Sequence, residues 1–343
     1  MQLLSFTDKG IYCSQGDFYI DPWRPVKRAV ITHAHSDHAR WGSEYYLCHK
    51  YTQPLLQLRL GNNNYQSVEW GETILMNGVK VSLHPAGHII GSSQVRIEYD
   101  GMVWVVSGDY KTEDDGLSSA MEIVKCNVFI SESTFGLPIY NWKSQREIFS
   151  DIRKWVLKNQ QNGKNSVLIA YSLGKAQRIL PCLAEITPDI FVHGAIWNVQ
   201  EALVNAGIQL PRVKRITQNM SREIIKGAVI IAPPGSDGSP WIKRFTPYAV
   251  GVCSGWMQVR GNVRRRNADA GFTLSDHADW NGLLKVIRST EADKVFVTHG
   301  FQSSLSRYLN ENGIESAEVK TEFGDGEQPL SPEEGNTQPE TET

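Results

Sequence analysis

The most constraining stretch of this sequence is a run of polar side chains directly after an apolar segment. Val30 and Ile31 lead into the motif H-x-H-x-D-H at residues 33–38, which holds three imidazoles and a carboxylate. These side chains cannot all be ordinary core residues, because the local backbone offers too few partners to satisfy so many buried polar groups. Shared metal would satisfy these groups. Because His and Asp form a mixed nitrogen and oxygen donor set, the run favours two adjacent divalent ions over one.

The spacing of the motif indicates how its residues divide between two ions. If residues 28–32 form a buried strand, His33 and His35 lie on one side where the chain leaves it and face one ion. Asp37 and His38 then turn toward the second ion. A histidine-rich surface loop is the alternative interpretation, because a short motif alone does not establish a site. We therefore treat a two-metal hydrolytic site as the first hypothesis.

Composition sets broad limits on the class of protein. The 343 residues are 41% apolar and 21% charged, which is ordinary for one large domain or two smaller ones. We expect a cytoplasmic protein that does not use membranes, because the N-terminus lacks a signal-peptide pattern and no apolar run has membrane-spanning length. The five cysteines are scattered and form no C-x-x-C pair, which argues against disulfides and a cysteine-rich zinc site.

Charge is unevenly distributed along the chain. Residues 322–343 hold seven acids and no Lys or Arg, whereas residues 1–321 hold 35 basic and 30 acidic residues. This acidic tail is also poor in large apolar residues, so we expect it to be disordered. Residues 201–270 hold eleven Lys or Arg against four acids. Such a region, which includes Arg264 and Arg265, is either a solvated face or a surface that binds nucleic-acid phosphates.

The pattern of apolar residues predicts two kinds of domain. Short strands fill the first hundred residues, and Asp100-Gly101 between two apolar runs predicts a type I′ hairpin. From about residue 141 strands and helices alternate, which predicts βα units and a partly parallel sheet. The chain then returns to the first domain. We expect a discontinuous domain of residues 1–136 and 256–321, an inserted α/β domain of residues 137–255, and a disordered tail of residues 322–343.

Two further short motifs end in His88 and Asp109, each just after an expected strand. Together with H-x-H-x-D-H they resemble the signature of the metallo-β-lactamase superfamily. The resemblance implies an α/β fold of the αββα sandwich type, with His33, His35 and His88 on one ion and Asp109 bridging both. It also implies that Asp21 accepts a hydrogen bond from a ligand histidine and does not touch metal.

Three more motifs contain Glu132, His277 and His299, and together with the insertion they resemble those of the β-CASP nucleases. This branch includes the polyadenylation endonuclease, RNase J and Artemis. The resemblance implies that His277, polarised by Glu132, protonates the leaving oxygen after a metal-bridged hydroxide attacks the phosphate. Ordinary core or capping roles are the alternative for His277 and His299. The implied ligands of the second ion are Asp37, which also counts as catalytic, His38, Asp109 and His299.

Residues 171–175 follow a strand and open a helix, so the amides near Ser172 and Gly174 and the side chain of Lys175 could hold a phosphate. This Y-S-x-G-K element resembles the DNA-repair branch, and the chain to about residue 320 resembles bacterial ligase-associated DNA exonucleases. The resemblance implies a DNA exonuclease, with a DNA ligase and a helicase of the same repair pathway as partners. His299 matches RNA-processing members instead, so a ribonuclease resembling those of mRNA 3′-end processing is the alternative.

Two other classes of protein share parts of this pattern. A metallohydrolase of small molecules such as thioesters would use the same metal site, but would explain neither the insertion nor Glu132 and His277. A non-catalytic scaffold would have lost ligands, and none is missing here. Zn²⁺ is the expected metal, and Mn²⁺ fits the same ligands because selectivity depends on geometry and supply.

Overall fold

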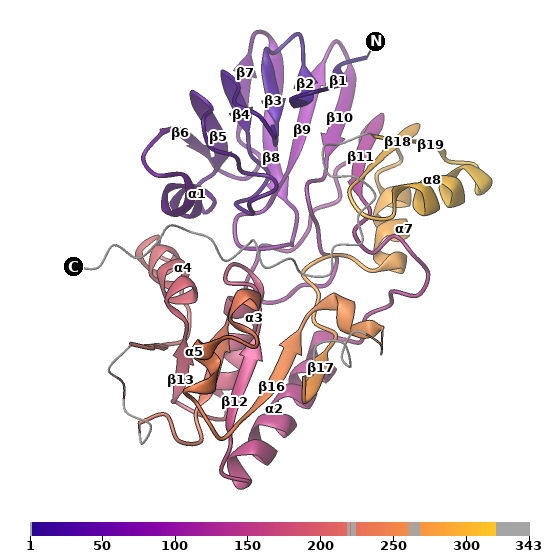
Figure 1. Ribbon diagram of the computed structural model, residues 1–343. Helices are drawn as coiled ribbons and strands as arrows, with labels where there is room; N and C mark the ends of the chain where they lie inside the picture. The colour runs from indigo at the N-terminus through magenta and orange to yellow at the C-terminus, as the bar shows by residue number, and fades with distance from the viewer. Residues whose placement is uncertain (1, 218–219, 221–223, 260, 262–267, 320–343) are drawn as a thin grey trace. The chain divides into compact units, whose positions relative to one another are not determined.

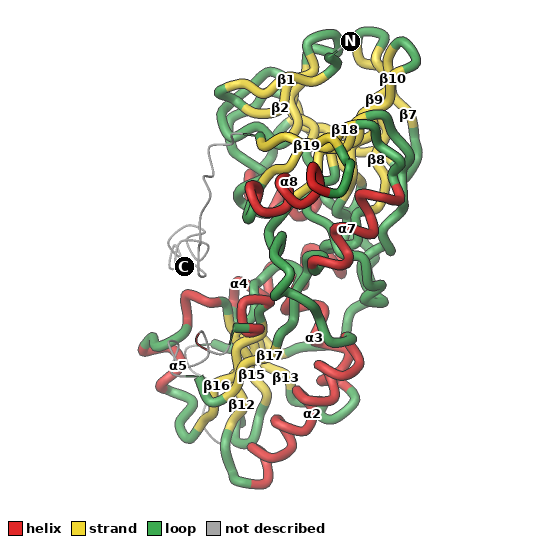
Figure 2. Tube along the Cα trace, turned by 90° about the vertical axis from the view of Figure 1, so that its right-hand side faces the viewer, coloured by secondary structure: helices red, strands yellow, loops and turns green. Residues whose placement is uncertain are grey.

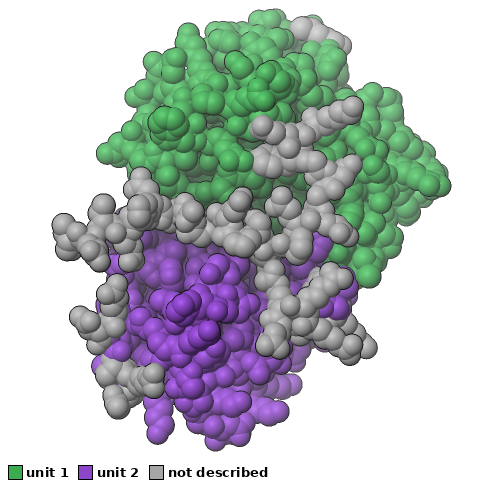
Figure 3. Space-filling model, in the orientation of Figure 1, with its two compact units in different colours: residues 1–141, 276–327 green, residues 142–275, 328–343 purple. Residues whose placement is uncertain are grey.

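The computed structural model describes residues 2–217, 220, 224–259, 261 and 268–319. The chain forms two compact units (Figure 3). Unit 1 combines the chain up to Asn141 with its C-terminal part from Asp276, and unit 2 is Trp142–Ser275. The acidic tail, Arg264 and Arg265 lie outside the described residues.

Unit 1 contains two β-sheets that pack face to face. In the first sheet the strand order is β1-β2-β3-β4-β5-β6. Its strands are β1 (Leu4–Thr7), β2 (Gly10–Cys13), β3 (Phe18–Ile20), β4 (Arg28–Val30), β5 (Tyr45–His49) and β6 (Asn64–Val68). The two sheets share one hydrophobic core. In it, Phe18 and Ile20 of the first sheet pack together with Val95 and Ile97 of the second sheet.

The second sheet of unit 1 has the order β19-β18-β11-β10-β9-β8-β7. Its strands are β7 (Thr73–Met76), β8 (Val79–Pro85), β9 (Ser93–Tyr99), β10 (Met102–Val106), β11 (Val128–Glu132), β18 (Lys294–Thr298) and β19 (Glu315–Glu318). Figure 1 shows that strands from both ends of the chain lie in this one sheet. Unit 1 is therefore discontinuous in sequence.

Helices complete the sandwich of unit 1. The face of the second sheet that carries Val105 and Phe129 is covered by α7 (Trp280–Ser289) and α8 (Gln302–Glu311). Figure 2 shows α8 beside β18 and β19. A shorter helix, α1 (Gln53–Leu60), connects β5 to β6. These layers confirm the predicted α/β sandwich.

The strand directions in the second sheet bring several strand ends to one edge. Asp100 and Gly101 have φ of 50° and 76°, as a type I′ turn requires, and they join β9 to β10 as an antiparallel hairpin. Antiparallel pairs on either side of β9 give β8 and β10 the same direction. The pairs β10–β11 and β11–β18 are parallel. The segments that follow β8, β10, β11 and β18 consequently leave the sheet at the same edge.

Unit 2 has an all-parallel sheet in the order β14-β13-β15-β12-β16-β17. Its strands are β12 (Asn165–Ile169), β13 (Ile190–Val192), β14 (Lys214–Arg215), β15 (Val229–Ala232), β16 (Tyr248–Cys253) and β17 (Ala270–Phe272). Its helices are α2 (Gln145–Gln161), α3 (Lys175–Ala184), α4 (Gly194–Asn205), α5 (Pro240–Lys243) and the 3₁₀ turns η1 (Pro234–Ser236) and η2 (Gly255–Gln258). Alternate residues of β12 face two cores, Leu168 toward α2 and α3 and Val167 toward α5.

The boundaries between the units differ from those expected from the sequence. Residues up to Asn141 belong to unit 1 because Trp280 N–H donates to the Tyr140 carbonyl at 3.0 Å. Residues 256–275 belong to unit 2, and not to the first domain as expected, because β17 pairs with β16. Phe272 also packs edge-on against Trp155 of α2.

Among the described residues, no helix combines the length and apolar character needed to cross a bilayer.

Candidate metal centre

The polar run at residues 33–38 forms a tight turn immediately after β4. β4 ends at Val30, and one residue later Ile31 N–H still donates to the Leu47 carbonyl of β5 at 2.8 Å. The carbonyl of His35 then accepts the N–H groups of His38 at 3.2 Å and Ala39 at 2.9 Å. This reversal returns the second half of the motif toward the first.

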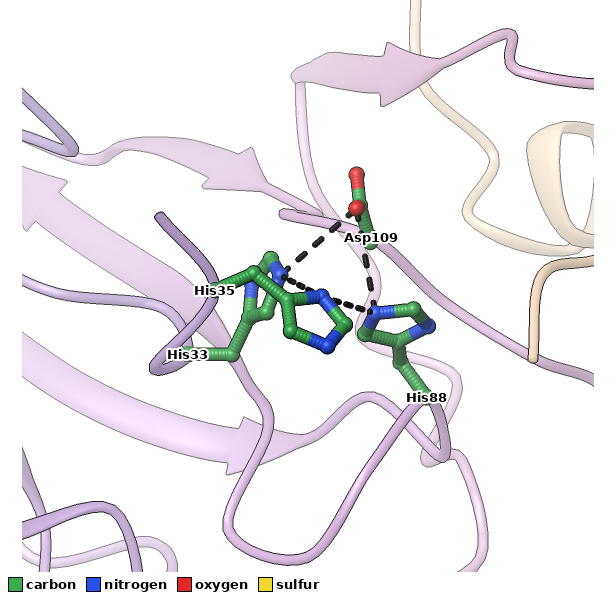
Figure 4. Close-up of side chains that lie close together, drawn as sticks. All are labelled: His33, His35, His88 and Asp109. Carbon is green, nitrogen blue, oxygen red and sulfur yellow. Dashed lines mark hydrogen bonds and ion pairs between the residues drawn. The ribbon is translucent and has the colours of Figure 1, made fainter. Parts of the chain in front are cut away.

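Four of the predicted ligands come together as a first set, shown in Figure 4: His33, His35, His88 and Asp109. Their donor atoms all lie within 4.8 Å of one another. Nε2 of His33 is 3.6 Å and Nε2 of His88 is 3.8 Å from Oδ2 of Asp109. His35 faces its neighbours with Nδ1, which is 3.2 Å from Nε2 of His33. Because His88 follows β8 and Asp109 follows β10, the parallel directions of those strands assemble this set.

A second set contains Asp37, His38 and His299, whose donor atoms also lie within 4.8 Å of one another. Nε2 of His38 is buried and has no hydrogen-bond partner among the described residues. The rings of His38 and His299 stack with centroids 5.0 Å apart. His299 follows β18 with φ of 52°, a conformation that is uncommon outside glycine and that Asn, Asp and His adopt more often than other residues. The neighbouring Gly300 is required, because a Cβ there would lie 2.4 Å from the Ser133 carbonyl oxygen.

Asp109 connects the two sets. Its Oδ2 is 3.5 Å from Nε2 of His38 as well as close to the first set. Burial alone would raise its pKa, but positive charge on His38 and then on His277 holds the pKa of Asp109 well below its usual range. The carboxylate is therefore ionised, as a ligand must be. The residues fit metal chemistry, since a buried ionised carboxylate needs a cation and the imidazoles of His33 and His88 lie close to it.

Burial also prepares the histidines of the first set. The pKa values of His33 and His88 are lowered well below the usual value, first by burial and then by charge on the neighbouring imidazoles His38 and His277 respectively. Neutral rings keep the nitrogen lone pair that metal binding uses. His38 differs, because the carboxylates of Asp109 and Asp37 outweigh burial and raise its pKa well above the usual value.

Glu132 and His277 form a third group with Asp109. Nδ1 of His277 lies 2.9 Å from Oε2 of Glu132, which ends β11 and is 1% exposed. Oε1 of Glu132 accepts the Tyr110 backbone N–H at 2.7 Å, which fixes the carboxylate. The side chain of His277 is 17% exposed, so solvent reaches the ring. The arrangement suits an imidazole that exchanges protons with a substrate.

Asp21 lies behind the second set. Its Oδ1 accepts the Thr32 backbone N–H at 2.8 Å, and its Oδ2 is 2.7 Å from Nδ1 of His38. Asp21 therefore contacts the ring of His38, one of the expected metal ligands. Two hydroxyl contacts were not predicted, those of Thr32 with His33 and of Thr298 with His299. The repeated Thr-His dipeptide was the only sequence signal for them.

The predicted phosphate-binding residues lie in unit 2. Gly174, with φ of 95°, precedes α3, and the Gln177 side chain accepts its N–H at 2.9 Å while donating to the Ser172 carbonyl at 3.0 Å. Lys175, the first residue of α3, is 5% exposed, and its Nζ lies 4.8 Å from the centre of the Tyr171 ring. The turn is thus fixed by its own side chains.

Comparison with known proteins places the chain in a family. No family model matches it. Curated proteins do match it, among them the three that follow. A protein named "Probable DNA ligase" from Opitutus terrae is 30% identical over 310 residues, covering 90% of this chain and 30% of that protein. RNase aCSPSF2 from Saccharolobus solfataricus is 29% identical over 306 residues, covering 76% and 61% of the two chains.

The third relative is cleavage and polyadenylation specificity factor 73 from Drosophila melanogaster. It is 28% identical over 348 residues, which cover 83% of this chain and 51% of that protein. The chain belongs to the β-CASP branch of the metallo-β-lactamase family. This β-CASP chain spans less than two thirds of the length of each of these three relatives.

A solved structure shares the fold of the β-CASP chain. It is the crystal structure of a protein of unknown function from Enterococcus faecalis V583, and the TM-score is 0.57. The superposition covers 88% of this chain and 80% of the Enterococcus faecalis chain. Since the two are 13% identical, the likeness concerns the fold alone.

Proposed function

We propose that the chain is a two-metal-dependent phosphodiesterase that acts as a DNA exonuclease in DNA repair. The observation that carries the proposal is the position of Asp109, whose Oδ2 lies 3.6 Å from Nε2 of His33 and 3.5 Å from Nε2 of His38. One carboxylate oxygen thus lies close to a histidine of each ligand set, so Asp109 would be shared by both sets if two cations were bound. Two bound divalent ions supply an activated water and neutralise the charge on the scissile phosphate. Zn²⁺ is the proposed metal, and Mn²⁺ suits the same donors.

In this proposal His277 supplies the proton to the leaving oxygen. Glu132 accepts the Nδ1 hydrogen at 2.9 Å and stabilises the imidazolium form, which then donates its Nε2 hydrogen. Asp37 is 38% exposed at its side chain, so it is the acidic ligand of the second set that borders solvent. Removal of His277 should consequently affect proton transfer, whereas removal of Asp37 should affect metal binding.

DNA is the proposed substrate because the match to the Opitutus terrae protein, whose name refers to DNA ligation, extends over 90% of this chain. The element at residues 171–175 supports the choice because it resembles the Y-S-x-G-K element of the DNA-repair branch, and Lys175 at the start of α3 is proposed to hold a terminal phosphate. Arg264 and Arg265 are proposed to bind backbone phosphates, although they lie outside the described residues.

RNA is the alternative substrate. RNase aCSPSF2 matches over 76% of this chain, and by resemblance His299 corresponds to the motif of RNA-processing members. His299 nevertheless belongs to the second ligand set. A metal ligand does not itself contact the sugar 2′-hydroxyl, so it carries less weight for substrate choice than the element at residues 171–175.

The proposed partners follow from the match to the Opitutus terrae protein. The matched segment makes up 30% of the Opitutus terrae protein, so a β-CASP segment and the rest of a protein named for DNA ligation share one polypeptide there. We therefore propose that this chain acts with a DNA ligase, and with a helicase of the same repair pathway, in the cytoplasm.

One experiment separates these functions. Single-stranded DNA and RNA of the same sequence, each with and without a 5′-phosphate, are incubated with the Zn²⁺- or Mn²⁺-loaded protein and with an Asp109→Ala control. Release of mononucleotides from DNA by the wild type alone supports the proposal. Faster cleavage of RNA would overturn the choice of DNA, and hydrolysis of a thioester without cleavage of either polymer would overturn the nuclease function.

A further inference from the structure

Two ligand histidines in different sets are each preceded by a threonine that contacts their outer ring nitrogen. Oγ1 of Thr32 lies 3.0 Å from Nδ1 of His33, and Oγ1 of Thr298 lies 2.9 Å from Nδ1 of His299. Both threonines are buried, at 0% and 6% exposure. Their hydroxyls therefore contact the imidazoles where water does not compete.

The contact has a direction once a metal is considered. His33 faces the other ligands of its set with Nε2, which leaves Nδ1 to carry the ring hydrogen. That hydrogen needs an acceptor, and a hydroxyl oxygen accepts one hydrogen while donating its own. Groups that hold the outer nitrogen of a ligand histidine fix the orientation of its ring. Thr32 and Thr298 stand in this position for His33 and His299.

Thr32 has a second contact that reaches the other ligand set. The Thr32 hydroxyl donates to Oδ2 of Asp21 at 2.5 Å. Oδ2 of Asp21 also accepts Nδ1–H of His38 at 2.7 Å. The hydrogen bonds thus run from His33 through Thr32 to Asp21, where they meet the bond from His38. The chain leaves room for the Thr32 side chain at Gly108, because a Cβ at that position would lie within 3.0 Å of Thr32.

We propose that Thr32 and Thr298 are positioning residues of the metal centre, with different reach. Thr32 couples the two ion sites, because the hydrogen bonds through it and Asp21 connect a ligand of each set. Thr298 serves the second site alone, because its hydroxyl contacts only His299 among the described ligands. The inference rests on the proposed two-metal function, which it deepens by assigning residues outside the ligand sets.

The test measures zinc binding, not cleavage. Zn²⁺ affinity and stoichiometry are determined by chelator competition for the wild type, Thr32→Val, Thr32→Ser and Thr298→Val. We expect Thr32→Val to weaken both ions by roughly 10- to 100-fold, the usual effect of losing such a partner. Thr298→Val should weaken one ion, and Thr32→Ser should restore the wild-type affinities because it keeps the hydroxyl.

Thr290→Val is the matched control. Thr290 is also buried in unit 1, at 1% exposure, but its hydroxyl donates to the Ile287 carbonyl and not to a ligand. This variant should keep both affinities. Thermal unfolding of the metal-free proteins shows whether each variant folds. If Thr32→Val does not fold, Asp21→Asn interrupts the same hydrogen bonds and should weaken both ions.

The outcomes separate the inference from the proposed function. A wild type that binds fewer than two Zn²⁺ ions would overturn the two-metal function itself. A wild type that binds two, with unchanged affinities in Thr32→Val or in Asp21→Asn, would overturn the inference alone. Weakening of one ion only in Thr32→Val would overturn the coupling.

Discussion

Glu132 and His277 are 145 residues apart in the sequence, yet Oε2 of the first lies 2.9 Å from Nδ1 of the second. The pair borders the first ligand set through Asp109, whose Oδ2 is 3.9 Å from Nδ1 of His277. His277 is not needed to complete either set of ligands. Its substitution should therefore separate catalysis from metal binding.

We expect His277→Ala to retain both ions and to lose roughly 10²- to 10⁴-fold in cleavage rate, the usual range for removing a general acid. Single-turnover cleavage and metal analysis of the same preparation check this. The matched control is His84→Ala, because His84 also pairs with a glutamate, Glu122 at 3.0 Å, but is outside the ligand sets. Loss of metal from His277→Ala would show that the ring is a ligand.

Asp109→Ala should lose metal and activity together. The substitution removes the one carboxylate oxygen close to both sets and leaves His33, His38 and His88 without their shared anion. Asp37→Ala should also lose activity together with metal, because it removes the other acidic ligand. Elemental analysis after dialysis measures the effect, and full activity in either variant would contradict the two-metal proposal.

His299→Ala should reduce the bound metal from two ions toward one. His299 belongs to the second set, whereas all four members of the first set remain. The backbone at His299 has φ of 52°, so a His299→Asn control keeps a residue that tolerates this conformation. Retention of two tightly bound ions in His299→Ala would remove this residue from the ligand set.

Lys175→Ala should lower the preference for a 5′-phosphorylated end more than it lowers the rate on an unphosphorylated end. The reason is that Lys175 lies at the start of α3, where its charge and the positive end of the helix dipole favour an anion. Lys158→Ala, an exposed substitution in α2, is the control for loss of one positive charge. Equal rate losses on both ends would contradict a phosphate-binding role. Raised salt should weaken binding of either DNA.

His49 should make stability depend on pH, apart from the metal centre. Its ring stacks on Trp70, and Nδ1 accepts the Tyr51 N–H at 3.3 Å. Burial lowers the pKa of His49 to about 4, against about 6.5 in an unfolded chain. Between these values the unfolded state binds more protons, so stability falls as pH drops from 6.5 to 4.

Urea unfolding of the metal-free protein across this range tests the effect of His49. The wild type should lose more stability between pH 6.5 and 4 than His49→Phe, because phenylalanine does not titrate. Each protein is compared with its own value at pH 7.5, which removes the difference in packing. Equal losses in the two proteins would show that His49 titrates normally when folded.

Residues of the ligand sets were accessible to sequence analysis because they follow apolar strands in short, recognisable motifs. His88 and Asp109 each leave a buried strand at the same edge of the sheet, so their chemistry and position are both visible in the sequence. Hydroxyl orientation is not. The contacts of Thr32 and Thr298 depend on side-chain geometry that the dipeptide Thr-His does not specify.

Some elements carry too little pattern to be predicted. β6 has the sequence Asn-Tyr-Gln-Ser-Val, most of it exposed, so no alternation of apolar residues marks this edge strand. β17 contains only Ala-Gly-Phe and follows the 3₁₀ turn η2. Its pairing with β16 is what extends unit 2 to Ser275, and such long-range pairing decides a boundary that composition alone placed too early.

The discontinuity of unit 1 has a consequence for synthesis on the ribosome. When residues up to Asn141 have emerged, the nascent chain already contains every member of the first ligand set but neither His277 nor His299. β11 can pair with β18 only after the residues of unit 2 have been synthesised, because Val128 pairs with Lys294. A truncated translation product therefore lacks the proposed general acid and one ligand of the second ion. Under the proposed function, cleavage of nucleic acid would begin only after translation has passed the inserted unit.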